Sequence, residues 1–130
     1  MERVTGIGGI FFKSPDPKAL GAWYRDHLGV DVQPWGSAVF DWHEDTDPAR
    51  PRCTVWSPFK DDTTYFAPST ARFMINYRVD NLDRMLAQLR AMGDKVDDKV
   101  EESEQGRFGW VMDPDGTRIE LWQPAPEPQT

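Results

Sequence analysis

Cysteine is almost absent from this 130-residue chain, which contains only Cys53. A single cysteine can form neither an intrachain disulfide nor a cysteine-cluster metal site. The first residues lack the charged and then apolar pattern of a secretion signal. No apolar run approaches the roughly 20 residues that a membrane-spanning helix needs. These absences predict a cytoplasmic protein.

Basic charge is also in short supply. Lys and Arg number 15 against 22 Asp and Glu, which gives a formal net charge of −7. An acidic chain without a basic run attracts neither a phosphate backbone nor an anionic lipid surface, so nucleic-acid and membrane partners are disfavoured. Aromatic residues make up 12%, including six Trp, which is too many for a disordered chain. The length predicts a single domain.

An internal repeat organises the chain. Three short segments of the first half recur in the second half in the same order, at offsets of 65, 64 and 66 residues. The pairs are residues 10–13 and 75–78, residues 28–32 and 92–96, and residues 55–58 and 121–124. Three matches at a nearly constant offset indicate two related modules.

Each module is predicted to form a strand, a helix and three further strands. In the first module we expect Asp16 to be the helix N-cap, Pro17 the first helical residue and Gly29 the left-handed end. A stripe at helical spacing is expected to be buried: Leu20, Trp23, Tyr24, His27 and Leu28. The strands are expected at residues 4–12, 31–34, 38–42 and 53–57. The glycines of residues 6–9 are expected to let the first strand bend or to let another backbone approach.

In the second module, Asp80 is the expected N-cap of the helix. The buried face of this helix is expected to consist of Leu82, Met85, Leu86 and Leu89. The strands are expected at residues 73–79, 95–101, 108–112 and 117–122. The single domain of residues 1–130 thus divides into modules at about 4–58 and 72–124, a linker at 59–71 and a frayed tail at 125–130.

The repeated unit, which ends in residues 113–122 (DPDGTRIELW), resembles the vicinal-oxygen-chelate superfamily. That superfamily includes glyoxalase I, bleomycin-resistance proteins and extradiol dioxygenases. Residues 23–29 (WYRDHLG) are similar to the aromatic-x-x-x-Leu-Gly helix end of the family. The resemblance covers about residues 4–124. It implies an α+β fold in which two tandem βαβββ modules pair edge to edge, and their curved mixed sheets enclose a cleft.

The resemblance also implies four metal-ligand positions on four strands. Three of these positions fall on Gly9, on Trp56 or Thr54, and on Met74, none of which is a useful ligand. Glu120 alone matches, whereas catalytic sites use about three protein ligands. We therefore predict no metal and no cofactor, and a metal-dependent lactoylglutathione lyase is disfavoured. The acidic cluster beside His43 is interpreted as solvated charge.

Strand alternation predicts which side chains face the cleft. The candidate ligand-binding residues are Phe11, Trp56, Met74, Asn76, Trp110, Glu120 and Trp122. Flat apolar walls with a few fixed polar groups are typical of a site for a small organic molecule. The alternative is that these aromatic side chains only fill the space that a metal and its water would occupy.

Glu120 has three possible roles: a structural partner of Arg78, Arg107 or Arg118, a ligand-binding group, or a general base. Three functions follow. The first is a metal-free, bleomycin-resistance-like protein that binds a small aromatic or cationic organic molecule. The second is a lyase, isomerase or dioxygenase that uses Glu120 as its catalytic residue, with or without a divalent metal. The third is a dimer or interaction module with a vestigial cleft; a homodimer is expected in any case, because two short sheets expose their edges.

Overall fold

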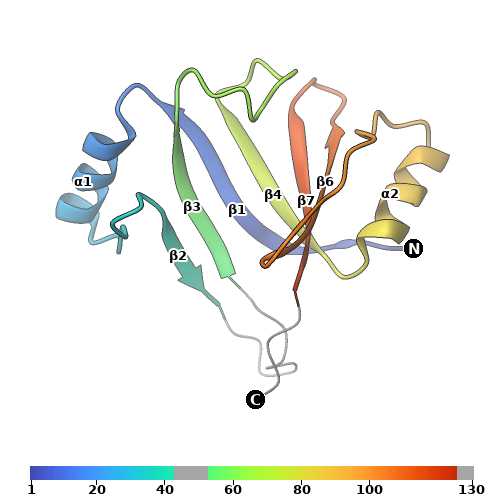
Figure 1. Cartoon of the computed structure of the whole chain (residues 1–130), viewed down its shortest axis with the longest axis horizontal. Coiled ribbons are helices and arrows are strands. Elements are labelled where there is room, and N and C mark those ends of the chain that lie inside the picture. The colour runs from blue at the N-terminus through green and yellow to red at the C-terminus, as the bar shows by residue number, and fades with distance from the viewer. Residues whose placement is uncertain (43–52, 126–130) are drawn as a thin grey trace.

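The computed structural model describes residues 1–42 and 53–125. In these ranges the chain forms one curled, seven-stranded mixed sheet with two helices on its outer side (Figure 1). The elements are β1 (Val4–Ser14), α1 (Pro17–Leu28), β2 (Ala38–Asp41), β3 (Cys53–Lys60), β4 (Phe73–Val79), α2 (Leu82–Ala91), β5 (Glu101–Ser103), β6 (Gly106–Met112) and β7 (Arg118–Pro124). The strand order is β2-β3-β1-β4-β7-β6-β5. The predicted α+β fold of tandem modules is confirmed.

The two modules join through the central strands of the sheet. β1 pairs antiparallel with β4, so the modules meet edge to edge, as the resemblance implied. Within each module the first strand pairs parallel with the last: β1 with β3, and β4 with β7. One continuous sheet therefore carries side chains from both modules on each of its faces.

The ends of α1 follow the predicted signals. Asp16 accepts a hydrogen bond from the Ala19 amide at 3.1 Å, and Pro17 begins the helix. Gly29 ends it at φ 68°, in the left-handed region that glycine favours. In the second helix the prediction was wrong by one residue. Asn81, not Asp80, caps α2 by accepting from the Arg84 amide at 3.0 Å.

Two predicted strands differ in the structure. Residues 31–34 form no strand, because a tight turn follows in which Gly36 takes φ 99° and donates to the Gln33 carbonyl. Residues 95–101 form only an isolated bridge at Val96 before β5 begins at Glu101. Between them, the Asp97 side chain accepts the Lys99 amide, a local bond that competes with a strand ladder.

The two helices contact the sheet differently. α2 buries Leu82, Met85 and Leu86 against the sheet, as predicted. α1 does not bury its apolar stripe, because Trp23 is 48% exposed and Leu28 is 61% exposed. Only Gly21 of α1 is buried, so this prediction was wrong. The helix rests on the sheet near Tyr24, and Trp23 stacks instead on the exposed His27 at 4.9 Å.

Two apolar clusters lie on opposite faces of the sheet. The helix-side core consists of Val79, Leu82, Met85, Leu86, Val111 and Leu121. The concave cluster consists of Phe66, Met74 and Trp110, with the partly buried Phe11, Phe59, Tyr65 and Phe108 packed against them. Neither helix of the described chain is long and apolar enough to cross a membrane.

Candidate functional site

The concave face brings together six of the seven candidate ligand-binding residues. Alternation along β4 directs Tyr77 and Val79 to the helix-side core and Met74 and Asn76 to the concave face. The residues that share the concave face are Phe11, Met74, Asn76, Trp110, Glu120 and Trp122. Strand alternation therefore predicted their placement correctly, whereas ligand binding by them stays a prediction.

Trp56 is the exception. Its ring lies 5.2 Å from Phe12 and 4.9 Å from Tyr24 of α1, so it packs on the helix side of the sheet. The expectation that Trp56 faces the cleft was wrong because of the strand register. Val55 pairs with Gly9, so Val55 takes the concave face and the next residue, Trp56, takes the other face. A shift of one residue exchanges the two faces of a strand.

Glu120 lies at the centre of the concave face and is 1% exposed. The register places Asn76 of β4 and Trp110 of β6 directly opposite it. Asn76 Nδ2 donates to Glu120 Oε1 at 2.7 Å, and Trp110 Nε1 donates to Oε2 at 3.0 Å. Burial of a carboxylate is costly unless it is hydrogen-bonded, and the neighbouring strands supply these bonds.

A third donor comes from outside the sheet. Segment 61–72 joins β3 to β4 at one end of the strands (Figure 1). It places the Tyr65 hydroxyl on Glu120 Oε2. The Tyr65 ring is stacked on Phe59 at 5.7 Å and meets Trp110 edge-on at 6.4 Å. Burial, together with the charge and hydrogen bond of Glu120, raises the pKa of Tyr65 above its ordinary value. Tyr65 therefore keeps its proton and acts as a donor.

The same segment fills the concave face with a second aromatic side chain. Phe66 is 0% exposed and packs with Met74 and Trp110. Sequence reasoning missed both Tyr65 and Phe66, because it treated the segment as a linker. The available signal was an adjacent aromatic pair in a segment that is otherwise rich in Asp and Thr.

Arg118 anchors the segment. Its guanidinium donates to the Tyr65 carbonyl at 2.8 Å and to the Ala67 carbonyl at 2.9 Å, and lies 4.8 Å from the centre of the Trp110 ring. Arg107 is paired with Asp83. Neither arginine is therefore the structural partner of Glu120, whose described partners are the three neutral donors.

Glycines in β1 leave room for these side chains. A Cβ at Gly8 would lie 2.6 Å from the Trp122 ring and would also collide with Asn76 Oδ1. Strand β1 does bend here, because its pairing with β4 shifts register between Ile7 and Gly9. The close approach is made by side chains rather than by another backbone. Asn76 Oδ1 faces this glycine and has no hydrogen-bond partner among the described residues.

The donor set around Glu120 does not fit a divalent metal. Four residues pair in line across neighbouring strands: Val55, Gly9, Asn76 and Glu120. They offer a single carboxylate, from Glu120, and the amide of Asn76, whose NH₂ group points at that carboxylate. In the part of the chain that the structure describes, no group of three His, Cys, Asp or Glu residues could hold a metal ion. The cluster beside His43 lies outside that part. That the protein holds no metal stays a prediction.

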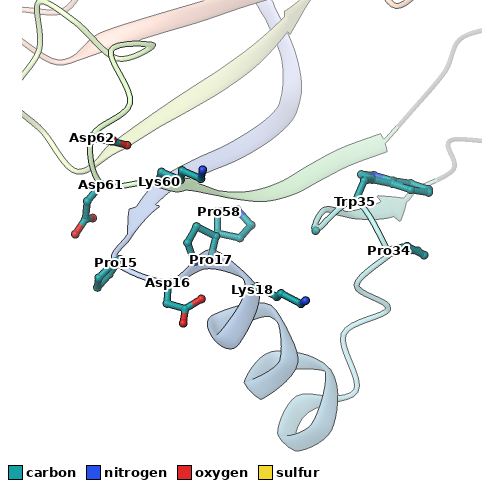
Figure 2. A pocket seen from close by; sticks show the side chains of 11 residues that line it. Pro15, Asp16, Pro17, Lys18, Pro34, Trp35, Pro58, Lys60, Asp61 and Asp62 are labelled. Atoms are coloured by element: carbon teal, nitrogen blue, oxygen red, sulfur yellow. The ribbon is translucent and has the colours of Figure 1, made fainter.

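Two surface pockets lie in different parts of the molecule. One of about 690 Å³ lies away from Glu120, between the start of α1 and the turn that carries Trp35, and Pro17 and Pro58 line it (Figure 2). A smaller pocket of about 270 Å³ borders Trp110, Arg118 and Pro68. Trp110 and Arg118 also contact Tyr65, through the Trp110 ring and the Tyr65 carbonyl, but neither Tyr65 nor Glu120 lines the smaller pocket.

Comparison with known proteins agrees with this architecture. The model of the glyoxalase-like domain family matches residues 9–122, and the chain therefore belongs to that family. Among curated proteins, no sequence matches it significantly.

Solved structures share the fold. Methylmalonyl-CoA epimerase from Mycobacterium tuberculosis is 22% identical with a TM-score of 0.64, over 95% of this chain and 91% of that one. A variant of the Streptomyces coelicolor epimerase, in complex with 2-nitronate-propionyl-CoA, is 18% identical with a TM-score of 0.65, over 92% and 96%. A glyoxalase/bleomycin resistance protein/dioxygenase superfamily member from Vibrio splendidus 12B01 is 13% identical with a TM-score of 0.57, over 93% and 97%. These likenesses show a shared fold, which is the fold that the resemblance implied.

Proposed function

We propose that this protein binds a small aromatic organic molecule, without a metal ion, at the Glu120 carboxylate of the concave face. The observation that carries the proposal is that the three donors to Glu120 come from different kinds of structure. Asn76 and Trp110 belong to strands inside the sheet, whereas Tyr65 belongs to the connecting segment. Moving the partly exposed Tyr65 side chain leaves the strand pairing intact, whereas moving Asn76 or Trp110 would break it. A ligand can therefore replace the Tyr65 hydroxyl without disturbing the sheet.

The surroundings of Glu120 define the ligands that the site accepts. Phe11, Phe59 and Trp110 supply aromatic walls that suit a flat apolar molecule. The buried carboxylate requires a hydrogen-bond donor or a cation from the ligand, and it repels anions. The net charge of −7 adds to this repulsion. The expected ligand is thus an aromatic molecule that is neutral or cationic.

The enzyme hypothesis receives less support. A general base accepts a proton from the substrate, so it needs a carboxylate oxygen that faces the substrate. Both oxygens of Glu120 already accept hydrogen bonds, from Asn76, Trp110 and Tyr65. The named neighbours include epimerases, but their low sequence identity carries the fold alone. An isomerase that uses Glu120 is therefore the less favoured use of this site.

The filled concave face favours a second candidate, an interaction module with a vestigial cleft. Phe66 and Met74 are 0% exposed and occupy space that a ligand would need. On the other face of the central strands, Ile7, Ile10 and Phe73 are 41–47% exposed. Such an apolar surface is typical of an association site, and it suits the predicted homodimer.

A thermal-shift screen separates the two candidates. We expect a neutral or cationic aromatic ligand at 100 times its Kd to raise Tm by about 10 °C, and aromatic carboxylates to leave it unchanged. Glu120→Gln should remove the shift that cationic ligands cause, because the charge is lost, and should only weaken the shift of neutral donors, since an amide oxygen still accepts a hydrogen bond. The control Glu102→Gln should keep both shifts, because Glu102 is exposed and pairs with Arg107 at the surface.

Two outcomes would contradict the proposal. A shift by a cationic ligand that survives unchanged in Glu120→Gln would place the ligand elsewhere. Failure of every aromatic class would leave the interaction module. Elemental analysis tests the metal prediction separately, because stoichiometric zinc, nickel or iron in the purified protein would overturn it.

A further inference from the structure

The Glu120 site already contains an aromatic hydroxyl group. Tyr65 enters it as a phenol: the hydroxyl donates to Glu120 Oε2 while the ring lies at 11° to Phe59. The edge of Trp110 meets the same ring at 89°. A stacked face, a perpendicular edge and a carboxylate acceptor together describe a receptor shaped for one phenol.

From this geometry we infer that the ligand of the site is a phenol, which takes the place of the Tyr65 side chain. The inference rests on the proposed function, because it names the chemical class that the Glu120 site binds. Tyr65 is then the internal competitor of the ligand, and it closes the site while no phenol is bound.

Charge and hydrogen bonding separate a phenol from other aromatic ligands. Asn76 and Trp110 already donate to the carboxylate, so a third neutral donor completes its hydrogen bonding without adding charge. A cationic ligand would have to leave water for a buried site, and desolvation offsets much of its attraction to Glu120. The Tyr65 hydroxyl keeps its proton here because its pKa is raised, and a phenolic ligand would keep its proton for the same reason.

The exchange requires movement of one side chain rather than of the whole segment. Arg118 holds the backbone carbonyls of Tyr65 and Ala67, and the buried Phe66 anchors the next position. Tyr65 itself remains partly exposed. The 270 Å³ pocket shares Trp110 and Arg118 with the surroundings of Tyr65.

The test compares three probes on the full chain and on two variants. The probes are p-cresol, its methyl ether 4-methylanisole, which cannot donate, and benzylammonium, which is a cation. Titration calorimetry of the wild type, Tyr65→Phe and Tyr65→Ala gives the affinities. Tyr77→Phe is the matched control, because Tyr77 packs against the helix-side core.

We expect p-cresol to bind Tyr65→Phe at least about tenfold more tightly than the wild type, because the competing bond to Glu120 is gone. Tyr65→Ala should bind it still more tightly, because the space of the ring is also free. Should Tyr65→Ala fail to fold, Tyr65→Phe alone decides. Tyr77→Phe should match the wild type.

Each other result has a distinct meaning. If 4-methylanisole binds as well as p-cresol, or benzylammonium binds more tightly, the phenol inference fails and small-molecule binding stands. Equal p-cresol affinity in the wild type and Tyr65→Phe overturns the role of Tyr65 as competitor. If no probe binds any variant and the wider aromatic screen is also negative, both the phenol inference and the proposed function fail.

Discussion

The two faces of the sheet are closed in different ways. The helix-side core is closed by α2 and is built on apolar side chains such as Leu82 and Leu121. The concave cluster is closed by segment 61–72, which contains no helix or strand, and it surrounds a carboxylate. Strand β7 supplies both faces from neighbouring positions, Leu121 to one and Glu120 to the other. One strand can therefore contribute apolar side chains to a stabilising core on one face of the sheet and hold a polar site on the other face.

The largest expected effect comes from the residue that fills the concave face. Phe66→Ala should lower the free energy of unfolding by about 3–5 kcal/mol, because the ring is fully buried. Urea denaturation measures this loss. Phe73→Ala is the control, since Phe73 is 47% exposed and should cost much less. Equal losses would mean that the segment does not pack as described.

The helix-side core should respond in stability alone. Leu82→Ala should cost about 2–5 kcal/mol, because Leu82 is 0% exposed in that core. The Leu82→Ala variant should bind the ligand with the same affinity as the wild type at a temperature where both proteins are folded. Calorimetric titration checks this point, and a large change in affinity would show that the two faces are coupled.

A smaller loss is expected at the centre of the concave face. Glu120→Gln should cost about 3 kcal/mol, because three buried donors lose their charged acceptor. The exposed Glu102→Gln should change stability by less than about 0.5 kcal/mol. Chemical denaturation of both variants decides, and a stable Glu120→Gln protein would argue against the hydrogen bonds described.

The smallest effect appears at high pH. Unfolded Tyr65 releases its proton near pH 10, whereas the folded protein retains it, because its folded pKa is raised. The contribution of Tyr65 to the free energy of unfolding is therefore complete below pH 10 and is lost as the pH rises above that value. The loss is at most about 1.4 kcal/mol per pH unit. Partial exposure of Tyr65 reduces the slope. Tyr65→Phe should lose less stability above pH 10 than the wild type, and identical pH profiles would contradict the raised pKa.

Local signals in the sequence predicted much of this fold. Asp16 and Gly29 mark the two ends of α1 correctly. The Asp16 side-chain cap and the left-handed Gly29 backbone are both interactions within a few residues of the chain. Alternation along β4 placed Met74 and Asn76 correctly, because a strand has a fixed period of two. The repeat and the resemblance supplied the pairing of the modules.

Other features depend on contacts that local patterns do not encode. Trp56 faces the helix because of how β3 pairs with β1, and a one-residue difference in register decides its face. The stripe of α1 is exposed at Trp23 because the helix contacts the sheet near Tyr24, whose ring packs on Trp56. Tyr65 reaches Glu120 across 55 positions of sequence, a separation over which periodicity gives no information.

The indole signal of Trp110 tests the central claim most directly. Its Nε1–H donates to Glu120, so a ligand at that carboxylate must change the environment of this proton. In nitrogen–proton correlation spectra, an aromatic binder should shift the Trp110 signal and leave that of Trp35 in place, since Trp35 lines the other pocket. A binder that shifts Trp35 while Trp110 stays unchanged would contradict a ligand site at Glu120.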